Sequence, residues 1–414
     1  MKKRFWAALF FPIILHAQID SYSSEEEIYN SKIQYIPFRP ADKDSILAFT
    51  SFAVNIKTLK HFSPFKTLND IRPYQKWSIR QGRETTYLDS NIAGIRLYWI
   101  IKQDENEKFK AIIYTDSKYD DPSNQGIWVA LYSKQEHRWH KYYTGLSEKT
   151  PLYLKWFSKK SLFKNDNTLQ IEAAFLQQTS PNSLPVNTAK YALIKDGLLV
   201  EFDLKKLAMD SDGDGLTDIE ENKMMLNPYN KDTDGDGISD SEDPNPRFNL
   251  APTNKTIIYE AFLSGIPLPR IHNPDTLQLR HLSAADRGVI YGETFHKIEL
   301  PEYFIYDTLF QSISKNKRID SSSNTYLIVS DEKDVQAIHV SKDRFIILTE
   351  EEYKIYHKKY PNTLTEKYVS PLFKVDNTKD TYKLKISDQS GGSSYLIERA
   401  DQGWKISLLS RYII

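Results

Sequence analysis

The chain has 414 residues, enough for two ordinary domains, and its 40% hydrophobic and 13% aromatic residues exclude a wholly disordered protein. The absence of cysteine excludes disulfides, thiolate metal sites, cysteine nucleophiles and a lipid-modified cysteine near the N-terminus. The formal net charge is zero, but residues 210–243 hold twelve Asp or Glu residues and only two lysines. So many acids at close range repel one another unless cations neutralise them.

The N-terminus has the pattern of a secretory signal peptide. Residues 2–4 are basic, residues 5–15 are apolar, and Leu15-His16-Ala17 is a suitable cleavage site. About eleven apolar residues at roughly 1.5 Å each are too short to span a membrane. We therefore predict that residues 1–17 are removed and that the mature protein is exported, to the periplasm, the cell surface or the medium. No stable membrane insertion is expected after cleavage.

Residues 18–207 are predicted to form an N-terminal β-rich domain. A helix is expected within residues 44–54. Runs of β-branched and aromatic residues, separated by polar turns, predict hairpins and further strands. The expected strands are residues 94–102 paired with 108–115, residues 126–133 paired with 138–144, residues 168–177, and residues 191–194 paired with 198–202 across the turn Lys195-Asp196-Gly197.

Residues 210–221 form the first of two acidic loops with the spacing of a calcium site. Calcium takes six to eight oxygens at about 2.3–2.6 Å, and a short loop supplies them when alternate residues point inward around a sharp turn. Gly215 stands at loop position six, where the backbone bends with positive φ. The expected ligands at positions one, three, five, seven, nine and twelve are Asp210, Asp212, Asp214, the carbonyl of Leu216, Asp218 directly or through water, and Glu221 with both oxygens.

The second acidic loop, residues 232–243, repeats this pattern. Its expected ligands are Asp232, Asp234, Asp236, the carbonyl of Ile238, Asp240 and Asp243. Asp243 is one methylene shorter than the glutamate of the first loop, with Glu242 as a substitute, so the second site is expected to be the weaker. Leu216 and Ile238 are expected to pack against each other.

The two Asp-x-Asp-Gly-Asp-Gly loops resemble the thrombospondin type 3 repeats of bacterial envelope proteins and are similar to the duplicated, EF-hand-like loops of dockerins. The resemblance covers residues 210–246. It implies Ca²⁺ binding and a rigid linker over residues 208–246, and it implies nothing about the activity of the flanking regions. A full helix-loop-helix sensor fits less well, since only residues 204–209 are left for an entering helix, and Pro244 and Pro246 shorten the last one. The alternative, a solvated acidic linker without metal, is disfavoured because the spacing recurs in register.

Residues 247–414 are predicted to form a C-terminal α+β domain. Apolar runs occur at residues 256–263 and 297–309, and Thr349 with Glu352 forms a capping box that predicts a helix over residues 350–359. The expected strands are residues 326–329, 335–340 and 344–348, and an antiparallel meander of residues 372–375, 381–386, 394–398 and 404–409. The predicted fold class is thus mainly β or α+β, with two β-rich domains joined by the acidic loop pair.

No catalytic residue is assigned. His137 and His140 stand in a predicted hairpin, where an offset of three residues places their rings on opposite faces. The stretch of residues 390–393 is interpreted as a hairpin turn. Scattered basic residues and the absence of a phosphate-binding glycine loop disfavour nucleotide or nucleic-acid binding. The tryptophans and tyrosines of the first domain fit either a sugar-binding face or a core.

The leading hypothesis is an exported protein in which calcium stiffens the junction of two domains that bind or adhere to a cell-surface glycan or protein. The alternative is a secreted or periplasmic hydrolase whose catalytic domain is the N-terminal one, with the same structural calcium. The sequence favours no enzymatic role.

Overall fold

The computed structural model describes residues 39–48, 52–65, 95, 100–118, 121–146, 151–180, 190–263, 302–307, 319, 323–339, 341–359, 365–375, 377–378, 380–388 and 391–413. The predicted signal peptide, residues 1–17, lies outside these ranges. No helix within them is long and apolar enough to cross a membrane. The fold is mainly β, as the sequence predicts.

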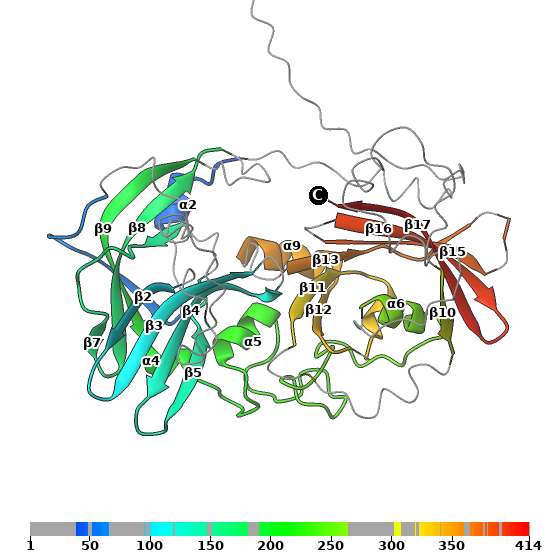
Figure 1. Cartoon of the computed structure of the whole chain (residues 1–414), viewed down its shortest axis with the longest axis horizontal. Helices are drawn as coiled ribbons and strands as arrows, with labels where there is room; N and C mark the ends of the chain where they lie inside the picture. The colour runs from blue at the N-terminus through cyan, green and yellow to red at the C-terminus, as the bar shows by residue number, and fades with distance from the viewer. Residues whose placement is uncertain are drawn as a thin grey trace, which may run out of the picture.

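The first half of the chain forms two antiparallel sheets, on the left of Figure 1. The four-stranded sheet runs in the order β2 (Ile100–Glu105), β3 (Phe109–Lys118), β4 (Asp121–Ser133) and β5 (Arg138–Tyr143). The five-stranded sheet runs in the order β1 (Val54–Thr58), β9 (Tyr191–Asp203), β8 (Thr168–Gln178) and β6 (Leu152–Leu154), with β7 (Phe163–Asn165) paired to β8. Two short helices, α2 (Lys43–Leu47) and α4 (Leu204–Leu207), flank the sheets in sequence.

The predicted hairpins β2–β3 and β4–β5 and the strand β8 are confirmed. The hairpin predicted across residues 195–197 is wrong, because β9 continues through them as one strand. Its partner β8 pairs on both sides, with Ala173 opposite Leu198 and Phe175 opposite Lys195. One extra residue is therefore accommodated on β9, and Gly197, at φ 69°, adopts the left-handed conformation of a bulge. In the described part of residues 44–54, where a helix is expected, α2 ends at Leu47 and Val54 is already the first residue of β1.

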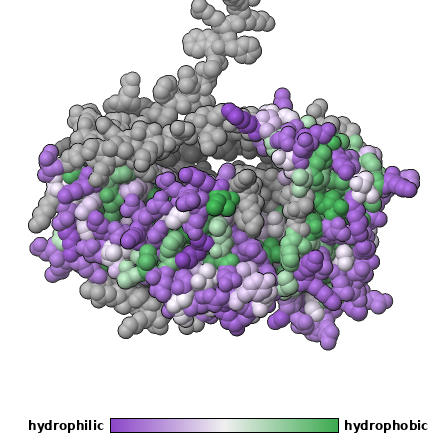
Figure 2. Space-filling model, turned by 180° about the vertical axis from the view of Figure 1, so that it is seen from behind, coloured by the Kyte–Doolittle hydropathy of each residue, from purple (hydrophilic) through white to green (hydrophobic). Residues whose placement is uncertain are grey.

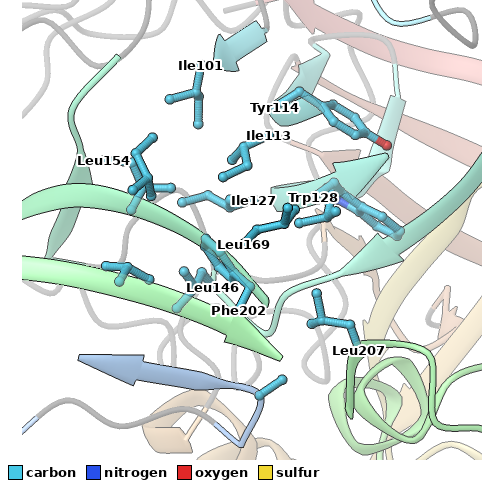
Figure 3. Packing of buried hydrophobic residues seen from close by; sticks show 14 of the residues in the cluster. Ile101, Ile113, Tyr114, Ile127, Trp128, Leu146, Leu154, Leu169, Phe202 and Leu207 are labelled. Atoms are coloured by element: carbon cyan, nitrogen blue, oxygen red, sulfur yellow. The ribbon is translucent and has the colours of Figure 1, made fainter. Parts of the chain in front are cut away.

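One large buried cluster, the first core cluster, fills the space between these two sheets (Figure 3). It draws on the four-stranded sheet through Ile113 and Ile127 and on the five-stranded sheet through Leu169 and Phe202. Leu207 of α4, which directly precedes the first acidic loop, is fully buried in it. The start of the acidic stretch is thus anchored in the N-terminal half by apolar burial.

The second half forms one eight-stranded mixed sheet, on the right of Figure 1. Its order is β10 (Glu302–Tyr306), β17 (Gly403–Ile413), β16 (Gly391–Ala400), β15 (Thr381–Asp388), β13 (Thr365–Val369), β11 (Thr325–Val329) and β12 (Arg344–Leu348), with β14 (Phe373–Lys374) paired to β15. The described part of this half contains the helices α6 (Thr256–Leu263), α8 (Lys333–Gln336) and α9 (Glu350–Lys359).

The meander β15–β16–β17 and the capped helix α9 are confirmed, the latter with Thr349 and Glu352 bonded to each other as a capping box. The strand predicted at residues 335–340 is wrong, since this segment begins within helix α8. Val335 and Ile338 are both fully buried, and a separation of three residues places two side chains on one face of a helical turn. Helix α8 joins β11 to β12 and α9 joins β12 to β13, so these three strands are parallel.

The second core cluster lies in the eight-stranded sheet and α6, with Tyr259, Phe345 and Trp404 among its largest members. A smaller junction cluster joins the acidic stretch to this sheet. It consists of Met224, Leu226, Leu327, Ile346, Leu348 and Tyr356. Strand β4 also contacts β11 and β13, so the two halves meet directly as well. On the face shown in Figure 2, hydrophilic residues predominate and hydrophobic residues occur in smaller groups between them.

Candidate metal centre

Both acidic loops have the same internal hydrogen bonding. In the first loop the carboxylate of Asp210 accepts from the amides of Gly213 (2.7 Å) and Gly215 (3.1 Å). In the second loop, Asp232 accepts from the equivalent amides of Gly235 and Gly237, both at 2.8 Å. The two copies therefore close around their first aspartate in the same way.

The glycine at position six of each loop has positive φ, 107° at Gly215 and 93° at Gly237. A side chain is strained in this conformation, although no heavy atom beyond the two flanking residues lies within 4 Å of where a Cβ would stand on either glycine. The requirement at position six is thus conformational, as the sequence pattern predicts.

The first three acids of each loop converge. One carboxylate oxygen from each of Asp210, Asp212 and Asp214 lies within 4.8 Å of the others, and Asp232, Asp234 and Asp236 form the matching group. Two oxygens on one calcium ion stand at most about 5 Å apart, because each Ca–O distance is about 2.3–2.6 Å. Each triplet is therefore compact enough to share one ion.

The aspartates at position nine hold each loop closed. Asp218 accepts from the amide and the hydroxyl of Ser211, both at 2.8 Å, and Asp240 accepts from the amide and hydroxyl of Thr233 at 2.8 and 2.6 Å. A hydroxyl residue at position two of both loops was the sequence signal for this brace, and it was missed. The carbonyl ligands expected from Leu216 and Ile238, and the contact between these two side chains, stay predictions.

The residues at position twelve are deeply buried. Glu221 is 0% exposed, and neither carboxylate oxygen has a hydrogen-bond partner among the described residues. Asp243 is 1% exposed, and within the same part of the chain its Oδ2 also lacks a partner. Asp212 and Asp234 each leave one buried oxygen without a described donor. Buried polar groups are almost always paired, so a partner outside the described residues is expected for these oxygens.

Burial and neighbouring acids raise the pKa values of these carboxyl groups. Burial, together with the charges of Asp212 and Asp214, raises the pKa of Glu221 to about 8. Burial, with Asp236 and Asp234 as neighbouring charges, raises the pKa of Asp243 to about 7. Asp234 and Asp240 reach about 6, again mainly through burial. A cation in each loop would favour the ionised forms and remove this conflict.

A local helix places Glu221. Helix α5 (Asp218–Met224) starts with a capping box, in which the Thr217 amide donates to Glu220 (3.0 Å) and the Glu220 amide donates to the Thr217 hydroxyl (3.4 Å). Glu220 is thereby turned back towards the helix start, and Glu221 is buried. No helix follows the second loop before α6, as Pro244 and Pro246 predict.

The two loops are bonded to each other. Asp214 accepts at Oδ2 from the Ser241 amide (2.9 Å) and the Ser239 hydroxyl (3.3 Å), and its carbonyl accepts from the Ser241 hydroxyl (2.8 Å). Lys231 donates to the carbonyl of Gly213 at 3.4 Å. A predicted ligand of the first loop is thus held by one amide and two hydroxyls of the second.

Buried Arg344 and partly buried Arg247 connect the loop pair to the eight-stranded sheet. Arg344 of β12 donates to the carbonyls of Ser241 (2.6 Å) and Asp243 (3.4 Å). Arg247 donates to the carbonyls of Met225 (2.5 Å) and Ile347 (3.1 Å) and pairs with Glu352 of α9 at 2.6 Å. Burial lowers the pKa of both arginines, against the raising effect of nearby acids.

The other candidate residues do not converge on a metal site in the described ranges. His140 bonds Glu136 at 2.8 Å on an exposed hairpin end, and His137 lies in the turn with φ 55°. Trp128 is buried in the first core cluster, while Trp156 is 42% exposed. Trp128 and Trp156 therefore do not share one exposed face.

No family model, no curated protein and no solved structure matches the chain. The resemblance to thrombospondin type 3 repeats consequently rests on the residues of the two loops. Their donor set consists entirely of oxygens, which suits a hard cation such as Ca²⁺ and not a thiolate-preferring or imidazole-preferring metal.

Proposed function

We propose that this protein is an exported calcium-binding protein whose two acidic loops each hold one ion and stiffen the junction of its two β-rich parts. The main support is the burial of Glu221 and Asp243 with carboxylate oxygens that have no partner in the described chain. Calcium is then structural, and the β-rich parts serve binding or adhesion to a cell-surface glycan or protein. Export is supported by the pattern of residues 1–17 alone.

The junction role is supported by the packing of α5. Ile219 at its start belongs to the first core cluster, and Met224 at its end belongs to the junction cluster on the eight-stranded sheet. Figure 1 shows α5 between the two halves of the molecule. Between these two anchors stands Glu221, so an ion bound there would fix the helix that both halves share.

Isothermal titration of the full chain with calcium chloride tests the proposal. We expect uptake of two ions, with dissociation constants at the weak end of the extracellular range, on the order of 10⁻⁴ to 10⁻³ M. Glu221→Gln is expected to lower the affinity for one ion at least about tenfold, a loss of about 1.4 kcal/mol of binding free energy. Glu220→Gln is the matched control, because glutamine preserves the capping box and the adjacent residue is not a proposed ligand.

Absence of calcium uptake at millimolar concentration would overturn the proposal. Equal weakening by Glu220→Gln and Glu221→Gln would also contradict it, because the effect would then follow from the helix and not from coordination. Titration with magnesium chloride provides a second control. Magnesium demands a near-octahedral shell and retains its waters, so weaker binding is expected.

A further inference from the structure

Asn245, two residues beyond the second loop, has an unusual environment. Its side chain is 1% exposed, and its Oδ1 has no hydrogen-bond partner in the described part of the chain. Leaving a buried acceptor unpaired is destabilising. No hydrogen bond accounts for the position of this oxygen.

The orientation of the amide is set by its neighbours. Nδ2 donates to the carbonyl of Gln336 in α8 at 2.7 Å and approaches the carbonyl of Phe248 at 3.4 Å. A flipped amide would place Oδ1 against these two acceptors, so Nδ2 has to face them and Oδ1 has to point away.

Asn245 is also tied to the last ligand of the second loop. Its backbone amide donates to Asp243 Oδ1 at 2.7 Å, which leaves Asp243 Oδ2 as the buried oxygen without a described partner. Asp243 Oδ2 and Asn245 Oδ1 are thus two buried acceptors without a described donor, on residues two positions apart. Asp234, whose Oδ2 is likewise buried without a described donor, is close enough to act on the charge of Asp243.

We propose that Asn245 supplies its amide oxygen as a further ligand of the ion in the second loop. This inference rests on the calcium binding proposed above. Calcium accepts amide carbonyl oxygens as well as carboxylate oxygens, and it takes six to eight ligands. Asn245 thereby compensates for the short side chain of Asp243, which offers one free oxygen where Glu221 offers two. With this extra ligand, the shorter side chain of Asp243 no longer implies that the second site binds calcium more weakly than the first.

The proposal also connects the ion to the second half of the molecule. The same amide group that offers Oδ1 to calcium donates Nδ2 to helix α8, and the neighbouring Pro244 carbonyl accepts from the Phe345 amide of β12 at 2.7 Å. The second site is consequently complete only when the segment after the loop is docked on this sheet.

The test compares calcium binding by the full chain and its variants. By isothermal titration we expect Asn245→Ala to retain one ion with unchanged affinity and to bind the other at least tenfold more weakly. Asn222→Ala is the matched control: the Asn222 amide also donates to a backbone carbonyl, that of Asp218 at 2.6 Å, but Asn222 is exposed. Both affinities of this variant are expected to stay within twofold of the wild type.

A crystal structure of the calcium-loaded wild-type chain supplies the second measurement and does not depend on the folding of a variant. An Asn245 Oδ1–Ca²⁺ distance of about 2.3–2.6 Å supports the proposal. It is overturned if the amide oxygen lies outside the coordination shell, or if Asn245→Ala binds both ions as the wild type does. Failure of the wild type to bind any calcium would instead overturn the proposed function itself.

Discussion

At the residue scale, the protein treats buried charges of opposite sign differently. Lys155 is fully buried, but its ammonium donates to Asp196 and to the Ser63 carbonyl and lies 4.9 and 4.8 Å from the ring centroids of Phe62 and Phe65. The cation has its partners within the chain. Glu221 is equally buried and has none in the described residues. This asymmetry supports the proposal that an external cation binds at the loops.

The raised pKa values predict how the ion-free protein responds to pH. Glu221 at about 8 and Asp243 at about 7 stand above the usual values near 4 for unfolded chains. At pH values between the unfolded pKa near 4 and these raised pKa values, the folded state binds more protons than the unfolded state. The free energy of unfolding therefore falls as pH rises. In chelator, we expect a lower melting midpoint at pH 8.5 than at pH 6.

Calcium is expected to remove this dependence, because it binds the ionised carboxylates and its stabilising effect grows as they lose protons. Glu221→Gln in chelator should show a smaller difference between the two pH values. A midpoint in chelator that rises from pH 6 to pH 8.5 would contradict the prediction.

At the scale of the element, α5 and its N-cap residue connect three features within eight residues, Thr217 to Met224. Its capping box begins it at Thr217, its first turn places Ile219 in the first core cluster, and its last turn reaches the junction cluster with Met224. Lys223 is buried, and its ammonium lies 4.3 Å from the ring centroid of Tyr143 of β5. So short a helix is not stable by itself, and these contacts hold it.

Truncation of one anchor should therefore affect both folding and calcium. Ile219→Ala is expected to destabilise the chain by about 2–5 kcal/mol, because it removes buried methyl groups and leaves a cavity. It should also weaken the ion of the first loop, since Glu221 is positioned by the same helix. Urea unfolding and calcium titration measure the two effects. The exposed Asn222→Ala on the same helix should change stability by no more than about 0.5 kcal/mol. Unchanged calcium affinity in a folded Ile219→Ala protein would show that α5 does not position the ligand.

At the scale of the whole molecule, the acidic stretch is packed between the halves and is not an extended tether. Arg344 and Arg247 hold its carbonyls, and the junction cluster joins it to β11, β12 and α9. The stretch nevertheless has twelve acidic residues and only two lysines. No cation of the described chain is paired with Glu221. Its order is therefore expected to depend on bound calcium.

Limited proteolysis with a glutamyl endopeptidase tests this dependence. With millimolar calcium, residues 210–243 should resist cleavage, and in chelator they should be cut first, because mutual repulsion opens the loops. Magnesium at the same concentration should protect less. Equal cleavage patterns with calcium and with chelator would contradict a calcium-dependent junction.

The sequence by itself was sufficient for features that depend on neighbours along the chain. Each of these features arises within about two dozen residues or fewer. They are the compact Asp triplets, the positive φ of Gly215 and Gly237, the capping box at Thr349, and the hairpins β2–β3 and β4–β5. Local spacing and turn chemistry determine such features. The same local reasoning was wrong at residues 195–197, where pairing with β8 turns a hairpin signal into a bulge, and at residues 335–340, where a short apolar run is part helix.

Tertiary structure alone decided what the loops are packed against. Distant segments bury Glu221 and Asp243. Other contacts join residues up to about a hundred positions apart: Asp214 with Ser241, Asn245 with α8, and Arg344 with the carbonyl of Asp243. The parallel pairing of β11 with β12 and β13 is likewise a feature that only the tertiary structure decided. Spacing along the chain indicates which residues can face an ion. Only the folded chain determines which of those oxygens are removed from water and left without a protein donor, because burial is a property of the surroundings that distant segments build.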